Sequence, residues 1–158
     1  AYGAYSFTSG ALGQRPWMAF APVQIDKTAE SLRELDREIR QYASGQVPPS
    51  DEEVARIQAT EIRSLPGAYE TGRAVMGTVG GMVRYDRPDD YVFQRKARIE
   101  ALDVDQVKRA AATIDPDKLV WVVVGDLRQT EAAVRALDLG EVRIVDADGQ
   151  PVTSPASM

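Results

Sequence analysis

The strongest candidate for a residue that takes part in catalysis is Tyr2, a tyrosine in the opening stretch of the chain. Its phenol hydroxyl could donate a hydrogen bond to the oxyanion that develops on a substrate carbonyl. The other interpretation is a strand residue that packs within a sheet, since aromatic residues are common in strands. The residue types around Tyr2 do not choose between the two.

Two residue types that dominate catalytic sites are missing, because the chain contains no His and no Cys. Zinc sites in proteins are built from Cys, His and carboxylates. Catalysis by Ser-His-Asp, Cys-His or a histidine general base is excluded as well. If the chain takes part in such chemistry, the decisive groups come from another segment, and we assign no metal ligand in this one.

Three further patterns have a structural explanation. The glycine-rich stretch Gly77–Gly81 follows no strand and lacks a Lys-Ser/Thr pair, so close helix packing is preferred over a phosphate loop. The acids from Asp146 onward resemble a calcium loop only faintly, because Ser157 stands where a bidentate Glu is required. The acids Asp51–Glu53 and Asp89–Asp90 fall at expected helix starts, where the helix dipole favours negative charge.

Composition excludes some classes of partner. The 158 residues carry a net charge of −5 with a pI near 4.8 and no run of Lys or Arg, so nucleic-acid binding is not expected. No apolar run approaches the ~20 residues of a membrane span. The compartment is left open, with the bacterial periplasm and cytoplasm as the two candidates.

The elements around Tyr2 begin with an extended, uncharged stretch over residues 1–9, which predicts an interior strand. A turn over residues 10–15 and a second apolar run over 16–25 predict an antiparallel hairpin. A continuous apolar run, 119–124, predicts a central strand buried on both faces, and 142–145 a last strand. Helical periodicity and capping residues predict helices at 28–44, 51–65, 69–83, 89–101, 104–114 and 130–137.

Helices grouped between strands, rather than alternating with them, favour an α+β fold. We therefore expect a two-layer sandwich, with a mostly antiparallel or mixed sheet and helices packed on one face. Residues 1–146 form the domain, and the polar residues 147–158 form a disordered tail.

Four stretches in this order resemble the C-terminal half of the inverzincin zinc metallopeptidases, the family of pitrilysin, insulinase and the mitochondrial processing peptidase. The stretches are Tyr2–Ser6, Val47–Glu53, Asp90–Val107 and Leu119–Asp126. Each is weak alone, but the ordered set covers most of the chain to residue 126. In that family one half carries the zinc motif, and the other carries an Arg and a Tyr that bind and polarise the substrate peptide.

The resemblance implies that Tyr2, through its Tyr-Gly-x-x-Ser context, supports catalysis by polarising the scissile carbonyl. Tyr2, Gly3 and Tyr5 would be substrate-binding residues. The matching Arg would precede residue 1, so we expect a domain truncated at its N-terminus and inactive alone. Zinc is implied on the other half of the enzyme, and no cofactor on this segment.

The function expected from the resemblance is the substrate-binding, non-zinc half of an endopeptidase that cleaves extended peptides. The alternatives are a non-catalytic partner subunit or peptide-binding module of the same family, and an unrelated α+β binding module. Expected partners are the zinc-bearing half or a partner subunit, and the peptide substrate, received at the hairpin edge by strand addition. Self-association through an exposed sheet edge is also predicted.

Overall fold

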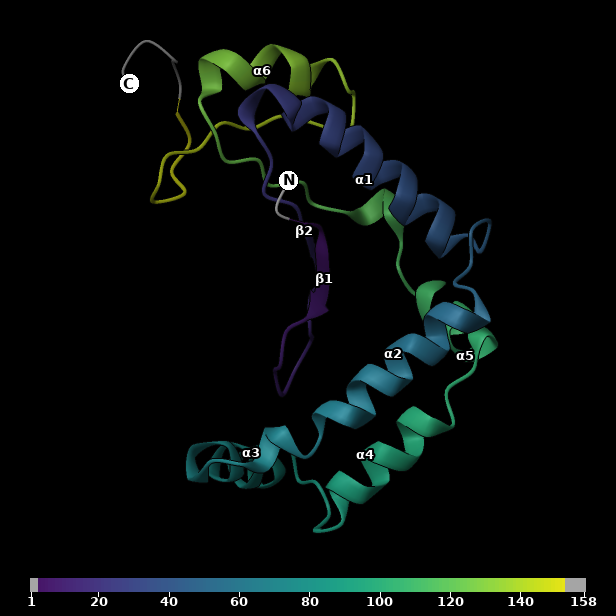
Figure 1. Cartoon of the computed structure of the whole chain (residues 1–158). Coiled ribbons are helices and arrows are strands. Elements are labelled where there is room, and N and C mark those ends of the chain that lie inside the picture. The colour runs from purple at the N-terminus through teal and green to yellow at the C-terminus, as the bar shows by residue number, and fades with distance from the viewer. Residues whose placement is uncertain (1–2, 153–158) are drawn as a thin grey trace. The chain divides into compact units, whose positions relative to one another are not determined.

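The computed structural model describes residues 3–152, and within them the backbone is mainly helical (Figure 1). Six α-helices, three short 3₁₀ helices and two strands follow one another. In chain order they are β1 Tyr5–Thr8, β2 Trp17–Phe20, η1 Ile25–Lys27, α1 Thr28–Ala43, α2 Asp51–Ser64, η2 Gly67–Tyr69, α3 Gly72–Arg84, α4 Tyr91–Glu100, α5 Val104–Ala111, η3 Pro116–Lys118 and α6 Leu127–Arg135.

The predicted α+β two-layer sandwich is wrong. The described residues contain one two-stranded antiparallel sheet, made by β1 and β2, in place of a layer of strands. Residues 119–124 form no strand, and of the expected last strand only Val145 makes an isolated bridge, to Pro151. A β-ladder needs a neighbouring chain segment to supply its hydrogen bonds. Among the described residues, 119–124 has none, and 142–145 has only the short turn that brings residues 150–152 beside it.

The hairpin predicted near the start of the chain is confirmed. β1 and β2 pair, and beyond them the Ser9 N–H donates to the Pro16 carbonyl at 3.1 Å. The prediction that the opening stretch is an interior strand is wrong, because all four residues of β1 are exposed. With two strands in the described sheet, each has an edge with no neighbouring strand.

Two helix starts predicted from capping residues, those of α2 and α5, are confirmed, whereas α4 begins at Tyr91 and the Asp90 side chain before it makes no capping hydrogen bond. At α2 the Glu53 N–H donates to Ser50 Oγ at 3.2 Å, and the Ser50 N–H donates to Glu53 Oε2 at 2.9 Å. The same reciprocal pair, Asp103 with Gln106, begins α5. These bonds satisfy backbone donors that the first turn of a helix leaves without partners.

The backbone divides into two separately packed groups, one of residues 3–6, 19–35 and 121–152 and the other of 7–18 and 36–120. In the second group α2 packs against α4. The Gln58 amide of α2 donates to the carbonyls of Ile99 at 2.8 Å and Leu102 at 2.9 Å, where α4 ends. Helix ends leave carbonyls without partners, so this side chain caps α4 and joins the two helices.

The first group is held by α6, which packs against η1. Thr130 of α6 is buried, and its hydroxyl donates to the Asp126 carbonyl at 3.0 Å. A Cβ added at Gly125 would lie 3.7 Å from the Thr130 methyl and 4.0 Å from Ile25 Cδ1, so the three residues are in contact range. Leu32 of α1 is the buried apolar residue of this group.

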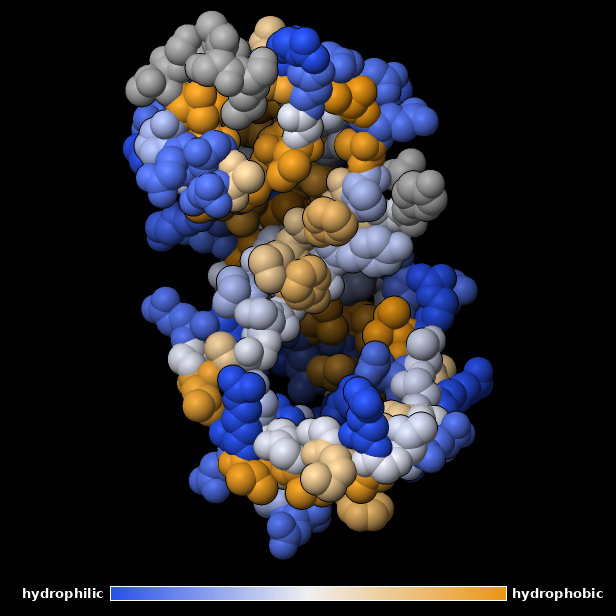
Figure 2. All heavy atoms as spheres, turned by 90° about the vertical axis from the view of Figure 1, so that its left-hand side faces the viewer, coloured by the Kyte–Doolittle hydropathy of each residue, from blue (hydrophilic) through white to orange (hydrophobic). Residues whose placement is uncertain are grey.

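Burial is sparse in both groups. Among the described apolar residues, Leu32 and Ala111 alone are buried, and Figure 2 shows apolar residues at the surface beside charged ones. The chain exposes 12195 Å². Large apolar side chains are exposed in both groups.

The close packing predicted for the glycines of α3 is wrong. A Cβ added at Gly72, Gly77, Gly80 or Gly81 would meet nothing within 4 Å, so these positions face open space. The short helix η2 packs against α3 and leaves the glycine positions uncovered. No helix among residues 3–152 is long and apolar enough to cross a membrane.

The start of the predicted tail forms a local turn. Asp146 Oδ1 accepts hydrogen bonds from the N–H groups of Asp148 at 3.0 Å and Gln150 at 2.8 Å. The Val152 N–H donates to the Ile144 carbonyl at 3.0 Å. The Asp146 carboxylate therefore organises its own loop. The prediction for residues 153–158 lies outside the described residues.

Candidate functional site

Two of the three site residues expected from the sequence lie within the described residues, at the start of the hairpin. Gly3 has φ +135°, a conformation that side-chain-bearing residues rarely adopt. A Cβ added there would lie 2.8 Å from Tyr5 Oη, so the Tyr5 ring folds back over position 3. Tyr2, the third residue, lies outside the described residues.

The surface next to this pair is an open strand edge. Tyr5 and Phe7 of β1 are exposed, as are Met18 and Phe20 of β2. Unpaired backbone groups at a strand edge can accept an extended peptide, and exposed aromatic side chains add contact area. The hairpin can therefore bind peptide backbone.

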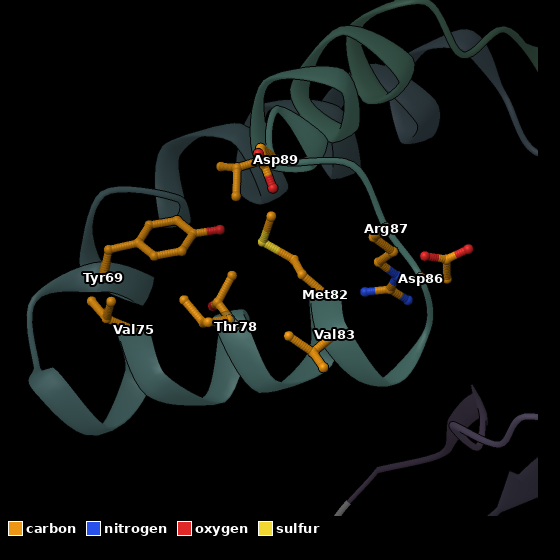
Figure 3. Close-up of a pocket in the computed structure, with 10 residues that line it drawn as sticks. Tyr69, Val75, Thr78, Met82, Val83, Asp86, Arg87 and Asp89 are labelled. Carbon is orange, nitrogen blue, oxygen red and sulfur yellow. The ribbon is translucent and has the colours of Figure 1, made fainter.

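A second candidate is an apolar groove over α3, which the sequence reasoning missed (Figure 3). Its volume is about 640 Å³. Tyr69 extends its ring toward Met82, whose side chain rises from α3. The lining residues are Tyr69, Val75, Thr78, Val79, Met82, Val83, Asp86, Arg87, Asp89 and Val92. Val75, Val79 and Met82 recur at helical spacing, which is a sequence signal for an apolar helix face.

The rim of the groove is organised by an arginine between aromatic rings. The Arg87 guanidinium carbon lies 4.3 Å from the Tyr91 ring centroid and 4.8 Å from that of Tyr85. Cation–π attraction at these distances restrains a side chain that is otherwise flexible. Asp86 and Asp89 lie on the same rim, so the groove has an apolar floor and a mixed-charge edge.

The groove is suited to binding rather than to catalysis. Its one hydroxyl on the helix, Thr78 Oγ1, donates to the Ala74 carbonyl at 3.1 Å within α3. Its other polar groups are the Tyr69 phenol and the charged rim. Such a surface can hold an apolar side chain of a ligand next to polar groups that orient it.

No metal site is seen in the part of the chain that the structure describes. Residues 3–152 contain no group of three or more His, Cys, Asp or Glu side chains placed to hold a metal ion. The strongest carboxylate perturbation belongs to Asp126, where hydrogen bonds from Arg128 hold the pKa well below its usual range. That carboxylate also accepts the Arg128 N–H at the start of α6, so its role is helix capping.

Comparisons with known proteins add no relative to this description. No family model matches the chain, and neither the curated proteins nor the solved structures searched contain a match.

Proposed function

We propose that this chain is the substrate-binding half, without the zinc site, of a zinc-dependent endopeptidase that cleaves extended peptides. The observation that carries the proposal is the ordered set of four stretches that resemble the second half of the inverzincin peptidases. The set begins with the Tyr-Gly-x-x-Ser context of Tyr2.

Local structure supports the proposal at two of those stretches. Val47–Glu53 leads into the capping box that starts α2. Asp90–Val107 contains α4 and the capped start of α5. Helices begin within both stretches, as the resemblance implies for Val47–Glu53, whereas Leu119–Asp126 does not form the expected strand.

The hairpin supports the binding role. An extended peptide would pair with its open edge through backbone hydrogen bonds, which are independent of the peptide's side chains. At Gly3 the space that a side chain would fill is taken by the Tyr5 ring. In this proposal the Tyr5 ring is the group that a substrate meets next to Tyr2.

In this proposal Tyr2 contributes one hydrogen bond to the reaction. Its phenol O–H donates to the carbonyl oxygen of the scissile bond as negative charge develops there. Removal of one such donor from an oxyanion site lowers kcat by a factor of about 10²–10³. The zinc ion, held by another polypeptide segment, would supply the Lewis acid, because this chain has no His or Cys to bind it.

The test is Tyr2→Phe in the natural full-length protein, assayed on an extended fluorogenic peptide. We expect kcat/KM to fall about 10²-fold, since phenylalanine keeps the ring and removes the donor. Tyr42→Phe, the same change on α1, is the matched control and should leave turnover unchanged. Equal turnover of Tyr2→Phe and wild type would remove Tyr2 from the mechanism.

The alternative is a non-catalytic partner subunit or peptide-binding module of the same family. It shares with the leading proposal the absence of His, which makes this chain dependent on another source of zinc ligands. The two readings differ in where a His-x-x-Glu-His motif lies. If the natural full-length polypeptide carries it, the enzyme reading holds. If peptidase activity appears only after a zinc-bearing second polypeptide is added, the subunit reading holds.

A further inference from the structure

The groove over α3 contains an arginine whose hydrogen-bond donors have no acceptor within the described residues. Arg87 is half-buried, and its guanidinium carbon lies 4.3 Å from the Tyr91 ring centroid and 4.8 Å from that of Tyr85. Across residues 3–152 its side chain makes no hydrogen bond and no ion pair. Stacking on the two rings therefore holds a planar fork of N–H donors in place at one end of the groove.

The carboxylates next to Arg87 leave it unpaired. Asp86 has a left-handed backbone, with φ +48°, and its carboxylate points away from the guanidinium (Figure 3). Asp89 lies across the groove from α3, and neither aspartate forms an ion pair with Arg87 in the described part of the chain. The groove therefore presents a positive donor and a negative acceptor as two separate groups.

The apolar floor of the groove has the length of a short peptide. Val75, Val79 and Met82 line it along α3, and the seven residues from the first to the last span about 10 Å of helix. Figure 3 shows Tyr69 and Arg87 at opposite ends of this floor. An extended peptide rises about 3.3 Å per residue, so about three residues cover the distance. The volume of about 640 Å³ is typical of pockets that hold small ligands.

We propose that this groove binds the C-terminal end of a peptide whose last residues, about three, are apolar. The terminal carboxylate accepts paired N–H bonds from Arg87, because the planar guanidinium and carboxylate groups match in geometry. The apolar side chains cover Val79 and Met82, and a backbone N–H of the peptide donates to Asp89. Capture of a free carboxylate terminus is a recurring mode of peptide recognition.

The mixed charge of the rim selects a peptide end over other apolar ligands. Arg87 is one cation beside two carboxylates, so a simple anion gains little from the rim as a whole. A fatty acid supplies the carboxylate but has no N–H for Asp89. An internal peptide segment supplies N–H groups but leaves the Arg87 donors without an anion. A peptide end with a free carboxylate supplies both.

This site is separate from the proposed peptidase site. Its lining residues, from Tyr69 to Val92, all lie in the group formed by residues 7–18 and 36–120. Binding in the groove requires neither Tyr2 nor turnover of a substrate. The Tyr2→Phe variant should therefore bind the peptide end as tightly as wild type does, whatever the effect of that change on turnover.

The first test changes the ligand and leaves the protein intact. Acetyl-Leu-Ala-Leu with a free carboxylate, and the same tripeptide as its C-terminal amide, are titrated against the natural full-length protein by ligand-observed NMR. The amide should bind about 10–100-fold more weakly, as expected for the loss of charge-assisted hydrogen bonds. Equal affinities, or no binding of the acid at millimolar concentration, would overturn the inference. Tighter binding of decanoate than of the acid would also overturn it, in favour of a fatty-acid site.

The second test removes the guanidinium. Arg87→Gln should weaken binding of the acid about 10–100-fold and make the acid and the amide bind equally, because their difference depends on this side chain. Arg84→Gln is the matched control, since Arg84 also lies near the Tyr85 ring, at 5.5 Å, and does not line the groove. Equal losses for the two variants would indicate a non-specific effect of charge and contradict the inference.

The third test concerns the apolar floor. Met82→Gln keeps the length of the side chain and adds a polar amide, so the affinity for the acid should fall about 5-fold or more. Met76→Gln, on the same helix, is the control, because Met76 is exposed and does not line the groove. Far-UV circular dichroism checks that both variants keep their helices. If Met82→Gln binds the acid as tightly as wild type does, the ligand lies elsewhere and the inference is wrong.

Discussion

At the scale of single residues, the candidate site depends on a backbone conformation at Gly3. Its φ of +135° is accessible to glycine and strained for residues with a side chain, by about 1–3 kcal/mol. The Tyr5 hydroxyl lies where a Cβ at position 3 would be. Gly3 and Tyr5 together set the backbone conformation and the ring position at the start of the hairpin. The proposed peptide-binding site depends on both.

The corresponding prediction concerns Gly3→Ala. The methyl group of alanine favours another φ at position 3 and displaces the Tyr5 ring. Rearrangement of the backbone that relieves a strain of about 1–2 kcal/mol should lower the affinity for an extended peptide about 5–30-fold. Fluorescence anisotropy with a labelled peptide measures the effect on the natural full-length protein. Gly13→Ala is the matched control, since a Cβ there meets nothing within 4 Å. Equal affinities of the two variants would contradict a role for Gly3.

At the scale of elements, the best-defined contact is that between α2 and α4. The Gln58 amide NH₂ donates to carbonyls at the C-terminus of α4, while Arg95 Nη2 and Glu61 Oε2 form an ion pair 2.8 Å apart. The Gln58–Ile99 bond and the Arg95–Glu61 bond are both partly buried, and both ion-pair side chains are more than 40% exposed. Water screens an ion pair of this exposure, whereas the Gln58 amide satisfies carbonyl oxygens at a helix end.

We therefore expect Gln58→Glu to destabilise the chain more than Glu61→Gln. A carboxylate at position 58 loses the donors and faces carbonyl oxygens at the negative end of the α4 dipole, at a cost of about 1–3 kcal/mol. Loss of the exposed ion pair should cost less than about 1 kcal/mol. Urea denaturation followed by circular dichroism gives both values. A larger loss for Glu61→Gln would show that the ion pair holds the helices together.

At the scale of the whole molecule, several carboxylates along the chain have a pKa that hydrogen bonds lower below its ordinary value. Hydrogen bonds from Ser50 lower the pKa of Glu53, and hydrogen bonds from Lys118 and Arg143 lower the pKa values of Asp115 and Glu141, respectively. A lowered folded-state pKa means that the fold favours the ionised form. The stabilisation is therefore present above the ordinary values of 3.8 and 4.5, and it is lost as pH falls through the folded-state values.

Thermal stability should accordingly fall as the pH is lowered from about 5 to about 3. Glu53→Gln should be less stable than wild type at neutral pH and lose less on acidification, because it has no carboxylate to protonate. Differential scanning fluorimetry across this range measures both effects. Glu52→Gln, in the same helical turn, leaves the Ser50–Glu53 bonds in place and is the matched control. Identical pH profiles for the wild type and Glu53→Gln would exclude a contribution from this cap.

What the sequence alone determined is the set of features encoded within a few neighbouring residues. The capped starts of α2 and α5 and the β1–β2 hairpin are where caps, periodicity and turn residues predicted them. These features could be predicted because each cap lies within four residues of the backbone groups it satisfies. Gly3 and Tyr5 are close in space for the same reason, since one residue separates them.

What the tertiary structure alone decided is burial and strand pairing. Residues 119–124 have the composition of a central strand, yet their exposure depends on whether a distant segment lies beside them, which local patterns do not encode. The groove likewise joins Tyr69 of η2 to Arg87 beyond α3, and the periodicity of α3 indicated only one of its walls. The α+β sandwich was wrong for this reason: strand propensity belongs to one segment, but a β-ladder requires two.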